Sequence, residues 1–514
     1  MFALLSYLRY ARSMHGLLAR YAHWRYRRER ALDWRISQAA TLQRCLKQST
    51  QTTFGLDHGL SAAMSVMDYQ SKVPLRTFEA LYEDYARGVH PNYQGVLTGN
   101  RLRFITTSSG TTSGLLKEFP VTWEGIQGSR KAAAHQAFAS IAKLGHMRPF
   151  QRAYLSIADL APLEDVGGGL KRGAITRILT ETTPGFVKRR AVLPQTTSSD
   201  AYEVLDAMVD AALRADLGML TGMTHWLLEF VERAKVKSGK SSMRAIWPNL
   251  QVICHGGMPA AVYEGALTEA FDGGDNPFVL AESYGASEGV LALGDPLLDG
   301  ALRLCSQNGI FYEFVPVSSF GQPDAPRLGV HEIEAGIPYA IVVTTPSGLW
   351  SHVVGDVVEF LDAELKTLVV KGRLSGSIEL WNEHMTESDV DLAFSALKEQ
   401  RGFETRFYHV GAMQYPDAMP RGRYVFFVEP ESDAGADASM LINLLDAELC
   451  RINKVYARLR AENGTLDEPA LHLVPKGFFD AWLDARPGGS LQRKVPRVDG
   501  TGRVLNELLA RLRA

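Results

Sequence analysis

The segment FVLAESYGASEGV, residues 278–290, joins a strand-like apolar run to a glycine turn that carries polar side chains. Short apolar or β-branched runs of the same kind recur along the chain, at 103–108, 153–158, 250–257, 339–345 and 424–430. Segments with helical periodicity alternate with them, at 34–48, 76–87, 200–214, 224–237 and 440–462. This alternation predicts an α/β fold in which most strands pair in parallel.

The chain of 514 residues is too long for one ordinary domain. Helical patterns disappear between 300 and 370, which predicts a β-rich subdomain, and short alternating elements return after about residue 375. We therefore expect three parts. They are a basic amphipathic extension at 1–35, a large domain with mixed sheets at 36–376, and a smaller α+β domain at 377–514.

The overall charge argues against a chain that binds nucleic acid, because 55 Lys and Arg nearly balance 57 Asp and Glu. The four cysteines form no CxxC pair, which favours a reducing, cytoplasmic setting and no structural zinc site. No apolar run is long enough to predict a membrane-spanning helix. Residues 1–30 hold seven arginines and one acid, Glu29. This pattern fits a helix packed on the body or a peripheral contact with a membrane surface, and we favour the packed helix.

The strongest local signal is TTSSGTTSGLLK, residues 106–117, which follows a predicted strand. Its small and hydroxyl residues would let backbone N–H groups and side chains surround phosphate oxygens, and Lys117 would add a positive charge. The candidate phosphate-binding residues are Ser108, Ser109, Gly110, Thr111, Thr112, Ser113, Gly114 and Lys117. The segment is not a Walker A sequence, and an ordinary surface loop would have a similar composition.

The turn at 285–289 has two functional interpretations. GASEG satisfies the G-x-S-x-G pattern of a nucleophile elbow, in which Ser287 would be the nucleophile of an α/β-hydrolase. An elbow must enter a helix, and Gly294-Asp295-Pro296 leaves room for about a turn and a half. Alternatively, Tyr284 lies beside a nucleotide base and Glu288 binds Mg²⁺ on its phosphates. A plain strand end with a glycine turn is the alternative without a function.

Two later segments add single candidate residues. Asp356, in VVGDVVEF (353–360), would accept hydrogen bonds from ribose hydroxyls, although Gly-Asp also occurs in ordinary hairpin turns. Lys494, in GGSLQRKVPRV (488–498), follows a glycine turn and precedes Pro496. An isolated lysine of this kind is usually solvated.

The order and spacing of these segments resemble the acyl-adenylate-forming superfamily of acyl-CoA synthetases and luciferase. The chain looks most like the Gretchen Hagen-type acyl acid amido synthetases, over about residues 40–500. The resemblance is carried by TTFGLDHGL (52–60), VPLRTFEALYEDY (73–85), TTSSGTTSGLLKEFP (106–120), TGMTHWLLEFVERA (221–234), IWPNLQVICHGG (246–257), ESYGASEG (282–289), FYEFVP (311–316), GIPYAIVVTTPSGL (336–349), VVGDVVEF (353–360) and LQRKVPR (491–497).

This resemblance implies ATP and Mg²⁺ as cofactors, and a small carboxylic acid and an amine, typically an amino acid, as substrates. The acid would be adenylated and its acyl group then transferred to the amine. By the same resemblance, the 108–117 segment holds the β- and γ-phosphates and Glu288 the Mg²⁺. Tyr284 and Gly285 line the adenine, Ser287 faces the α-phosphate or the acyl carboxylate, and Asp356 and Arg373 contact the nucleotide. Lys494, on a mobile small domain, is expected to move in during adenylation.

Two segments depart from the family pattern. Trp350-Ser351-His352-Val353 replaces a Tyr-Arg-Tyr-Arg stretch, so the positive charge of those arginines must come from elsewhere. His384 stands where the family has a lysine. Three alternatives stay open: a ligase that uses CoA as acceptor, the Ser287 hydrolase, and a nucleotide-binding protein without catalysis. Met223, Trp226 and Tyr312 are candidate walls of the acyl pocket, and core packing would explain them equally well.

Overall fold

The computed structural model describes residues 12–108, 117–157, 162–196, 198, 201–256, 267–270, 278–322, 324–374, 377–378, 380, 383, 385–415, 422–431, 437–461, 466–485, 495–499 and 502–513. Its contacts divide these residues into two compact units. The first holds residues 12–108, Lys117–Val354 and Glu359–Val369, and the second holds Gly355–Val358 and the described residues from Val370 onward. We describe each unit by itself. The limits predicted for three parts of the chain stay predictions.

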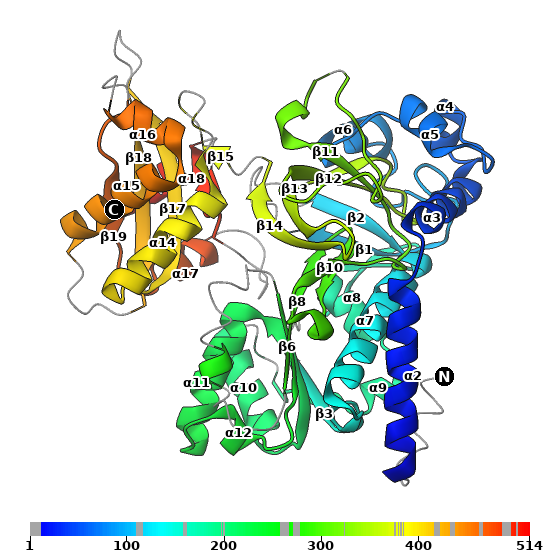
Figure 1. Cartoon of the computed structure of the whole chain (residues 1–514), viewed down its shortest axis with the longest axis horizontal. Coiled ribbons are helices and arrows are strands. Elements are labelled where there is room, and N and C mark those ends of the chain that lie inside the picture. The colour runs from blue at the N-terminus through cyan, green and yellow to red at the C-terminus, as the bar shows by residue number, and fades with distance from the viewer. Residues whose placement is uncertain are drawn as a thin grey trace. The chain divides into compact units, whose positions relative to one another are not determined.

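A ten-stranded sheet dominates the first unit (Figure 1). In spatial order its strands are β11 (Phe311–Pro316), β12 (Pro338–Thr344), β13 (His352–Asp362), β14 (Thr367–Arg373), β10 (Leu302–Leu304), β9 (Gly289–Gly294), β8 (Val279–Ala286), β7 (Val252–Gly256), β6 (Leu217–Met223) and β3 (Ala153–Ile157). The strands expected in the β-rich segment are present, and they extend this sheet instead of forming one of their own.

Fewer strands of this sheet pair in parallel than the sequence predicts. It joins β3, β6, β7 and β8. The pairs β8–β9, β9–β10, β10–β14 and β11–β12 are antiparallel. The change occurs at β8 because only two residues connect it to β9, and a parallel crossover needs a dozen or more.

Helices cover both faces of the parallel strands. On one face, Leu144 of α7 (Trp123–Leu144) packs against Val252, Val279 and Ala281. The other face carries α10 (Ala201–Leu213) and α11 (Thr224–Ser238). Because side chains alternate along a strand, Cys254 of β7 points toward α7 and His255 toward α11.

A smaller sheet and a group of short helices complete the first unit. The sheet has the order β2 (Lys117–Thr122), β1 (Leu102–Ser108), β5 (Leu170–Gly173) and β4 (Glu164–Gly167). The other elements are α3 (Trp34–Ser49), α4 (Thr53–Asp57), α5 (Val66–Lys72), α6 (Phe78–Leu81), the π-helical turn η1 (Tyr82–Ala86), α8 (Ile175–Thr182), α9 (Gly185–Lys188), α12 (Met243–Ile246), and the 3₁₀ turns η2 (Arg148–Gln151), η3 (Pro296–Leu298) and η4 (Val317–Ser319). Trp350 lies fully buried in the core that α3, α4 and α5 build.

The N-terminal helix α2 (Arg12–Arg30) packs lengthwise on α7 (Figure 1). Ala22 joins Phe138 in an apolar cluster, and Glu29, whose side chain is 10% exposed, pairs with Arg303 at 2.7 Å. The packed-helix interpretation is therefore confirmed for residues 12–30, whereas residues 1–11 lie outside the described part. No helix within the described ranges is long and apolar enough to cross a bilayer.

The second unit is an α+β sandwich, as expected. Its sheet has the order β19 (Ala470–Leu473), β18 (Gly422–Pro430), β17 (Thr405–Gln414) and β20 (Val498–Asp499), and a short pair joins β15 (Ser377–Ile378) to β16 (Met385–Thr386). One face is covered by α14 (Glu387–Arg401), α15 (Ala438–Ile452) and α16 (Lys454–Ala461), and the other by α17 (Phe478–Asp484) and α18 (Arg503–Leu512). Alternation along β18 explains this, since Phe426 belongs to the first core and Phe427 to the second.

Candidate active site

Polar side chains gather at the carboxyl ends of the parallel strands, the edge where α/β sheets bind ligands. Thr224, directly after β6, lies 3.4 Å from His255 Nδ1 on β7, and the Ser283 hydroxyl of β8 donates to the His255 carbonyl at 3.0 Å. Burial lowers the pKa of His255 to about 4, so this imidazole is neutral at pH 7. A side chain at Gly256 would lie 2.4 Å from the Ser283 carbonyl oxygen, which explains the glycine.

The candidate residues of 284–288 lie together on the β8–β9 hairpin. Ala286 pairs with Gly289, so Ser287 and Glu288 form a two-residue turn at the tip. Tyr284 and Gly285 belong to the last residues of β8. A nucleophile elbow requires a helix after the serine, and here β9 follows. The hydrolase interpretation of Ser287 is therefore wrong in its structural premise.

Glu288 is held from the side by His352, the first residue of β13. His352 Nε2 lies 3.1 Å from Glu288 Oε1, and the two side chains are 2% and 7% exposed. The Phe119 ring meets the imidazole edge-on at 5.7 Å between ring centres. His352 Nδ1 is buried without a hydrogen-bond partner among the described residues. The sequence placed this histidine in a segment that departs from the family pattern, but gave no sign of its partner.

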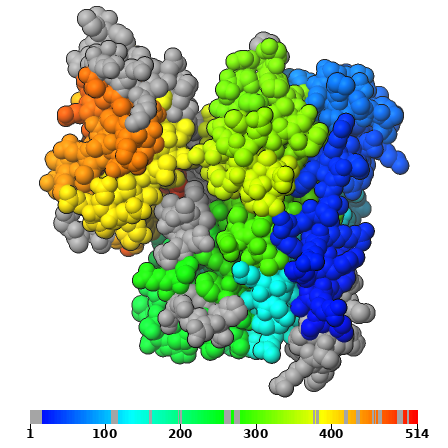
Figure 2. All heavy atoms as spheres, in the orientation of Figure 1, coloured from blue at the N-terminus to red at the C-terminus, as the bar shows by residue number. Residues whose placement is uncertain are grey.

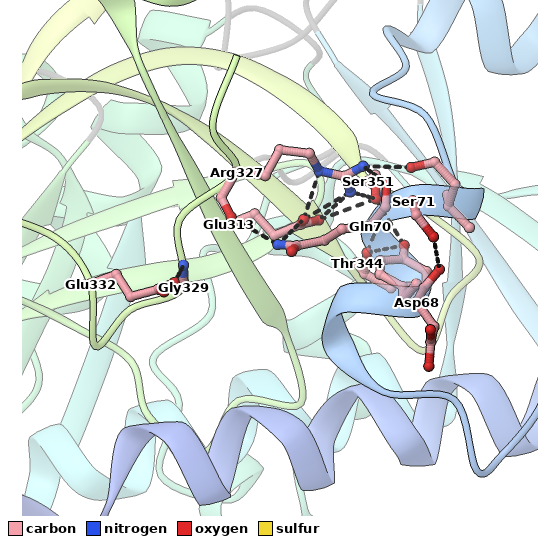
Figure 3. A network of polar contacts seen from close by, with 11 residues as sticks. Asp68, Gln70, Ser71, Glu313, Arg327, Gly329, Glu332, Thr344 and Ser351 are labelled. Atoms are coloured by element: carbon pink, nitrogen blue, oxygen red, sulfur yellow. Dashed lines mark hydrogen bonds and ion pairs between the residues drawn. The ribbon is translucent and has the colours of Figure 1, made fainter. Parts of the chain in front are cut away.

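The residue before His352 is fixed by a buried polar network (Figure 3). Ser351 has a left-handed backbone with φ of 42°. Its N–H donates to Thr344 Oγ1 at 3.0 Å, and its hydroxyl lies 3.0 Å from the Tyr69 hydroxyl and 3.1 Å from Glu313 Oε2. These bonds hold the start of β13 in one conformation.

Arg327 completes this network. Its guanidinium donates to both carboxylate oxygens of Glu313, which is fully buried, and to the Ser351 hydroxyl. It also donates to the carbonyl of Val73 at 2.6 Å. A positive group therefore lies beside position 351, where the family has an arginine. Because Glu313 neutralises that group, it supplies no free charge to a substrate.

A mainly apolar cavity adjoins the hairpin tip. It is lined by Ser287, Glu288, Gly289, Val290, Asn308, Ile310, Thr345, Pro346, Ser347, Pro120, Val121, Gly125, Ile126, Ser129, Ile175 and Leu179. As the side chains stand it has about 20 Å³ of space, enough for about one water molecule. A larger molecule would enter only if lining side chains moved.

The candidate phosphate segment connects the facing ends of β1 and β2. Ser108 pairs with Lys117 in the antiparallel register. Lys117 Nζ forms an ion pair with Glu79 at 2.6 Å and lies 5.8 Å from the centre of the Phe78 ring. The side chain of Ser108, together with the whole of Ser109, Gly110, Thr111, Thr112, Ser113 and Gly114, lies outside the described part. Beyond Lys117, β2 lines the cavity through Pro120 and Val121.

The second unit brings two other candidates together. Arg373 Nε lies 3.2 Å from Asp356 Oδ1, and Asp356 is buried. Glu387, at the start of α14, belongs to the same charged group. Burial raises the pKa of Glu387, although Arg497 and Arg373 oppose that shift.

Lys494 and His384 lie outside the described residues, but the chain just after Lys494 is anchored. The His409 ring donates from Nδ1 to the Pro496 carbonyl at 2.6 Å, and the N–H of Val410 donates to the Arg497 carbonyl at 2.7 Å. The segment that follows Lys494 is thus attached to β17.

The predicted acyl-pocket walls separate into two groups. Tyr312 is fully buried and donates to the Leu291 carbonyl at 3.3 Å, which makes it a core residue. Met223 and Trp226 are half-buried at the end of β6 and the start of α11.

The described residues contain no group of three or more His, Cys, Asp or Glu side chains that could hold a metal by themselves. A single carboxylate such as that of Glu288 is compatible with Mg²⁺, because Mg²⁺ is usually bound through one or two carboxylates together with the phosphates of a substrate. His352 contacts only Oε1, so Oε2 remains for a metal.

The architecture is that of the acyl acid amido synthetases. One solved structure, AtGH3.15 acyl acid amido synthetase in complex with 2,4-DB, superposes with a TM-score of 0.76 at 17% identity and covers 96% of each chain. The GH3 family N-terminal, central and C-terminal domains match residues 32–206, 303–367 and 388–500. The chain therefore belongs to the GH3 family, as the sequence resemblance predicted.

Two curated relatives show how far the sequence similarity extends. The probable indole-3-acetic acid-amido synthetase GH3.11 of Oryza sativa subsp. japonica is 28% identical over 51% of this chain and 47% of its own length. The 4-substituted benzoates-glutamate ligase GH3.12 of Arabidopsis thaliana is 24% identical over 53% of this chain and 49% of its own length. The chain thus spans about half the length of each of these relatives.

Proposed function

We propose that this protein is an ATP-dependent ligase that joins a carboxylic acid to an amine, with an amino acid as the favoured acceptor. A carboxylate oxygen of the acid attacks the α-phosphorus of ATP, and the bond to the β-phosphate breaks to release pyrophosphate. The amine nitrogen then attacks the acyl carbon, loses a proton and displaces AMP. The observation that carries the proposal is Glu288, at the tip of a hairpin on the edge of the sheet where α/β folds commonly bind ligands.

The chain's own residues have separate tasks in this proposal. Glu288 would hold Mg²⁺, which would offset the negative charge of the departing pyrophosphate. The 108–117 segment, with Lys117, would hold the β- and γ-phosphates if Lys117 left its ion pair with Glu79. Ser287 would face the α-phosphate or the acyl carboxylate, and Tyr284 and Gly285 would line the adenine. Asp356 would contact the ribose, and Arg373 would contact the nucleotide. The apolar cavity beside Glu288 would accept the acyl chain after lining side chains move.

The names of the relatives suggest the substrate class. They are described as acting on indole-3-acetic acid and on 4-substituted benzoates, with glutamate as one acceptor. We infer that this chain takes a small carboxylic acid with an apolar body, since the cavity beside Glu288 is mainly apolar.

The proposal is tested by measuring pyrophosphate release from ATP and Mg²⁺ with a panel of carboxylic acids, with and without amino acids. We expect release to require an acid, and an amide to form only when an amino acid is present. If a product forms only with CoA, the thioester ligase replaces this proposal. If no acid causes release, the proposed adenylation is contradicted.

Lys494→Ala is expected to slow pyrophosphate release by about 10²-fold, because the lysine would stabilise negative oxygens only during adenylation. Amide formation from a supplied acyl-adenylate should be unchanged. Lys476→Ala is the matched control, since Lys476 lies in the same unit and its Nζ pairs with Glu431 at 3.2 Å. Equal losses in both half-reactions would contradict a specific role of Lys494 in adenylation.

We also propose that α2 contacts anionic membrane surfaces. Leu17 and Trp24 are 61% and 50% exposed, and Arg20, Arg27 and Arg28 are exposed along the same side of the helix. Figure 2 shows α2, in dark blue, uncovered on this side of the molecule. The only acid of α2, Glu29, points inward to Arg303.

The full chain should therefore sediment with phosphatidylserine-containing vesicles and not with phosphatidylcholine vesicles. Changing the three arginines to Gln together should weaken binding by about 10²-fold, at about 1 kcal/mol for each charge. Equal binding to both kinds of vesicle, or to neither, would contradict the proposal.

A further inference from the structure

We infer that His352 is a positioning residue that orients the Glu288 carboxylate for Mg²⁺. The inference rests on the proposed function, because it gives His352 a role beside the proposed metal ligand. It starts from the contact of 3.1 Å between His352 Nε2 and Glu288 Oε1, in a place where both side chains are nearly closed to solvent. Carboxylates that bind metals are commonly held by such a second hydrogen bond.

The direction of the hydrogen bond follows from the other ring nitrogen. His352 Nδ1 is buried and has no partner among the described residues. A ring that carries its proton on Nε2 leaves only an acceptor unpaired, whereas a proton on Nδ1 would leave a buried donor unpaired and Nε2 facing the carboxylate as an acceptor. His352 therefore donates from Nε2 to Glu288 Oε1. This bond fixes one oxygen of the carboxylate and leaves Oε2 for the metal.

The imidazole itself has little freedom to turn away. The backbone on both sides of it pairs with Arg76, whose N–H donates to the Ser351 carbonyl at 3.1 Å and whose carbonyl accepts from Val353 at 2.9 Å. Phe119 meets the ring edge, and the polar network at Ser351 fixes the preceding residue. Arg327 and Glu313 thus hold Ser351 in place, Ser351 fixes the position of His352, and His352 contacts Glu288.

Two substitutions separate positioning from packing. His352→Gln keeps an N–H donor near the place of Nε2, and His352→Leu removes it. The readout is a calorimetric titration of Mg·ATP into the full chain without any acid, so that no turnover occurs. We expect His352→Leu to weaken Mg·ATP binding by about 10- to 100-fold and His352→Gln to keep most of the affinity. If His352→Leu does not fold, His352→Asn takes its place, because its shorter amide cannot reach Glu288.

A double-mutant cycle tests whether His352 acts through Glu288. In a Glu288→Gln background, His352→Leu should cause no further loss of Mg·ATP affinity, since the oriented carboxylate is already gone. The same loss in both backgrounds, or equal losses for Leu and Gln at 352, would overturn the inference. A wild-type chain that fails to bind Mg·ATP would overturn the proposed function as well. Wild-type binding that His352→Leu leaves unchanged would overturn this inference alone.

Discussion

Glu288→Gln is expected to lower acid-dependent pyrophosphate release by about 10²–10³-fold, because it removes the charge that would hold Mg²⁺ against the departing group. The amide has nearly the shape of the carboxylate and can still accept a hydrogen bond from His352. The hairpin, whose tip is set by the pairing of Ala286 with Gly289, should therefore keep its structure. Stopped-time assays of pyrophosphate at saturating ATP measure the change.

Ser287→Ala is the matched control, since Ser287 is the neighbouring residue of the same two-residue turn. The proposed reaction needs no nucleophilic side chain, so this change should cost less than Glu288→Gln. If Ser287→Ala abolished turnover while Glu288→Gln did not, the account of Glu288 as the metal-binding residue would be wrong.

Arg327→Met is expected to lower the free energy of unfolding by about 3–5 kcal/mol, because it leaves the carboxylate of Glu313 buried and unpaired. Glu313 is 0% exposed and would keep only weaker partners such as Gln70, whose side-chain N–H donates to it at 3.1 Å. Urea denaturation followed by fluorescence measures this loss.

The double variant Arg327→Met with Glu313→Leu should recover most of the stability, since a matched apolar pair removes the unpaired charge. Arg87→Met tests an exposed ion pair, Arg87 with Glu83, and should change stability little. An Arg327→Met chain as stable as the wild type would contradict the role given to this network.

The strands could be predicted from the sequence wherever apolar, β-branched residues form short runs between turns. The runs at 153–158, 250–257 and 278–285 correspond to β3, β7 and β8 within two residues at each end. These strands belong to the parallel part of the sheet, where helices cover both faces and strands typically have an almost continuous apolar sequence. The helix predicted at 440–462 is present but is interrupted at Asn453.

The long helix α7 was not predicted, and its packing explains why. Its inward positions are often small, including Gly128, Ser129 and Ala132, so the apolar periodicity is weak. A side chain at Gly128 would lie 1.8 Å from the Asn308 carbonyl oxygen. The helix thus approaches a neighbouring loop too closely for larger residues. Contacts between distant segments set this requirement, and the local pattern does not reveal it.

In the candidate site, too, the local sequence predicts some features, whereas others depend on contacts between distant segments. The sequence placed Ser287 and Glu288 in a turn at a strand end, where a local pattern suffices. It did not predict that β9 returns antiparallel, nor that His352 meets Glu288 from 64 positions away. Likewise, Arg327 could not be connected with Ser351 without the fold, because only the sheet brings β13 beside the segment that carries Arg327.

The most direct test of the account follows an oxygen atom. The protein is incubated with ATP, Mg²⁺, an amino acid and a carboxylic acid labelled with ¹⁸O in its carboxyl group, and the products are analysed by mass spectrometry. If the acid is activated as an acyl-adenylate, each amide formed leaves one ¹⁸O atom in AMP. Label in inorganic phosphate together with ADP, or amide formation without label in AMP, would contradict activation of the acid as an acyl-adenylate.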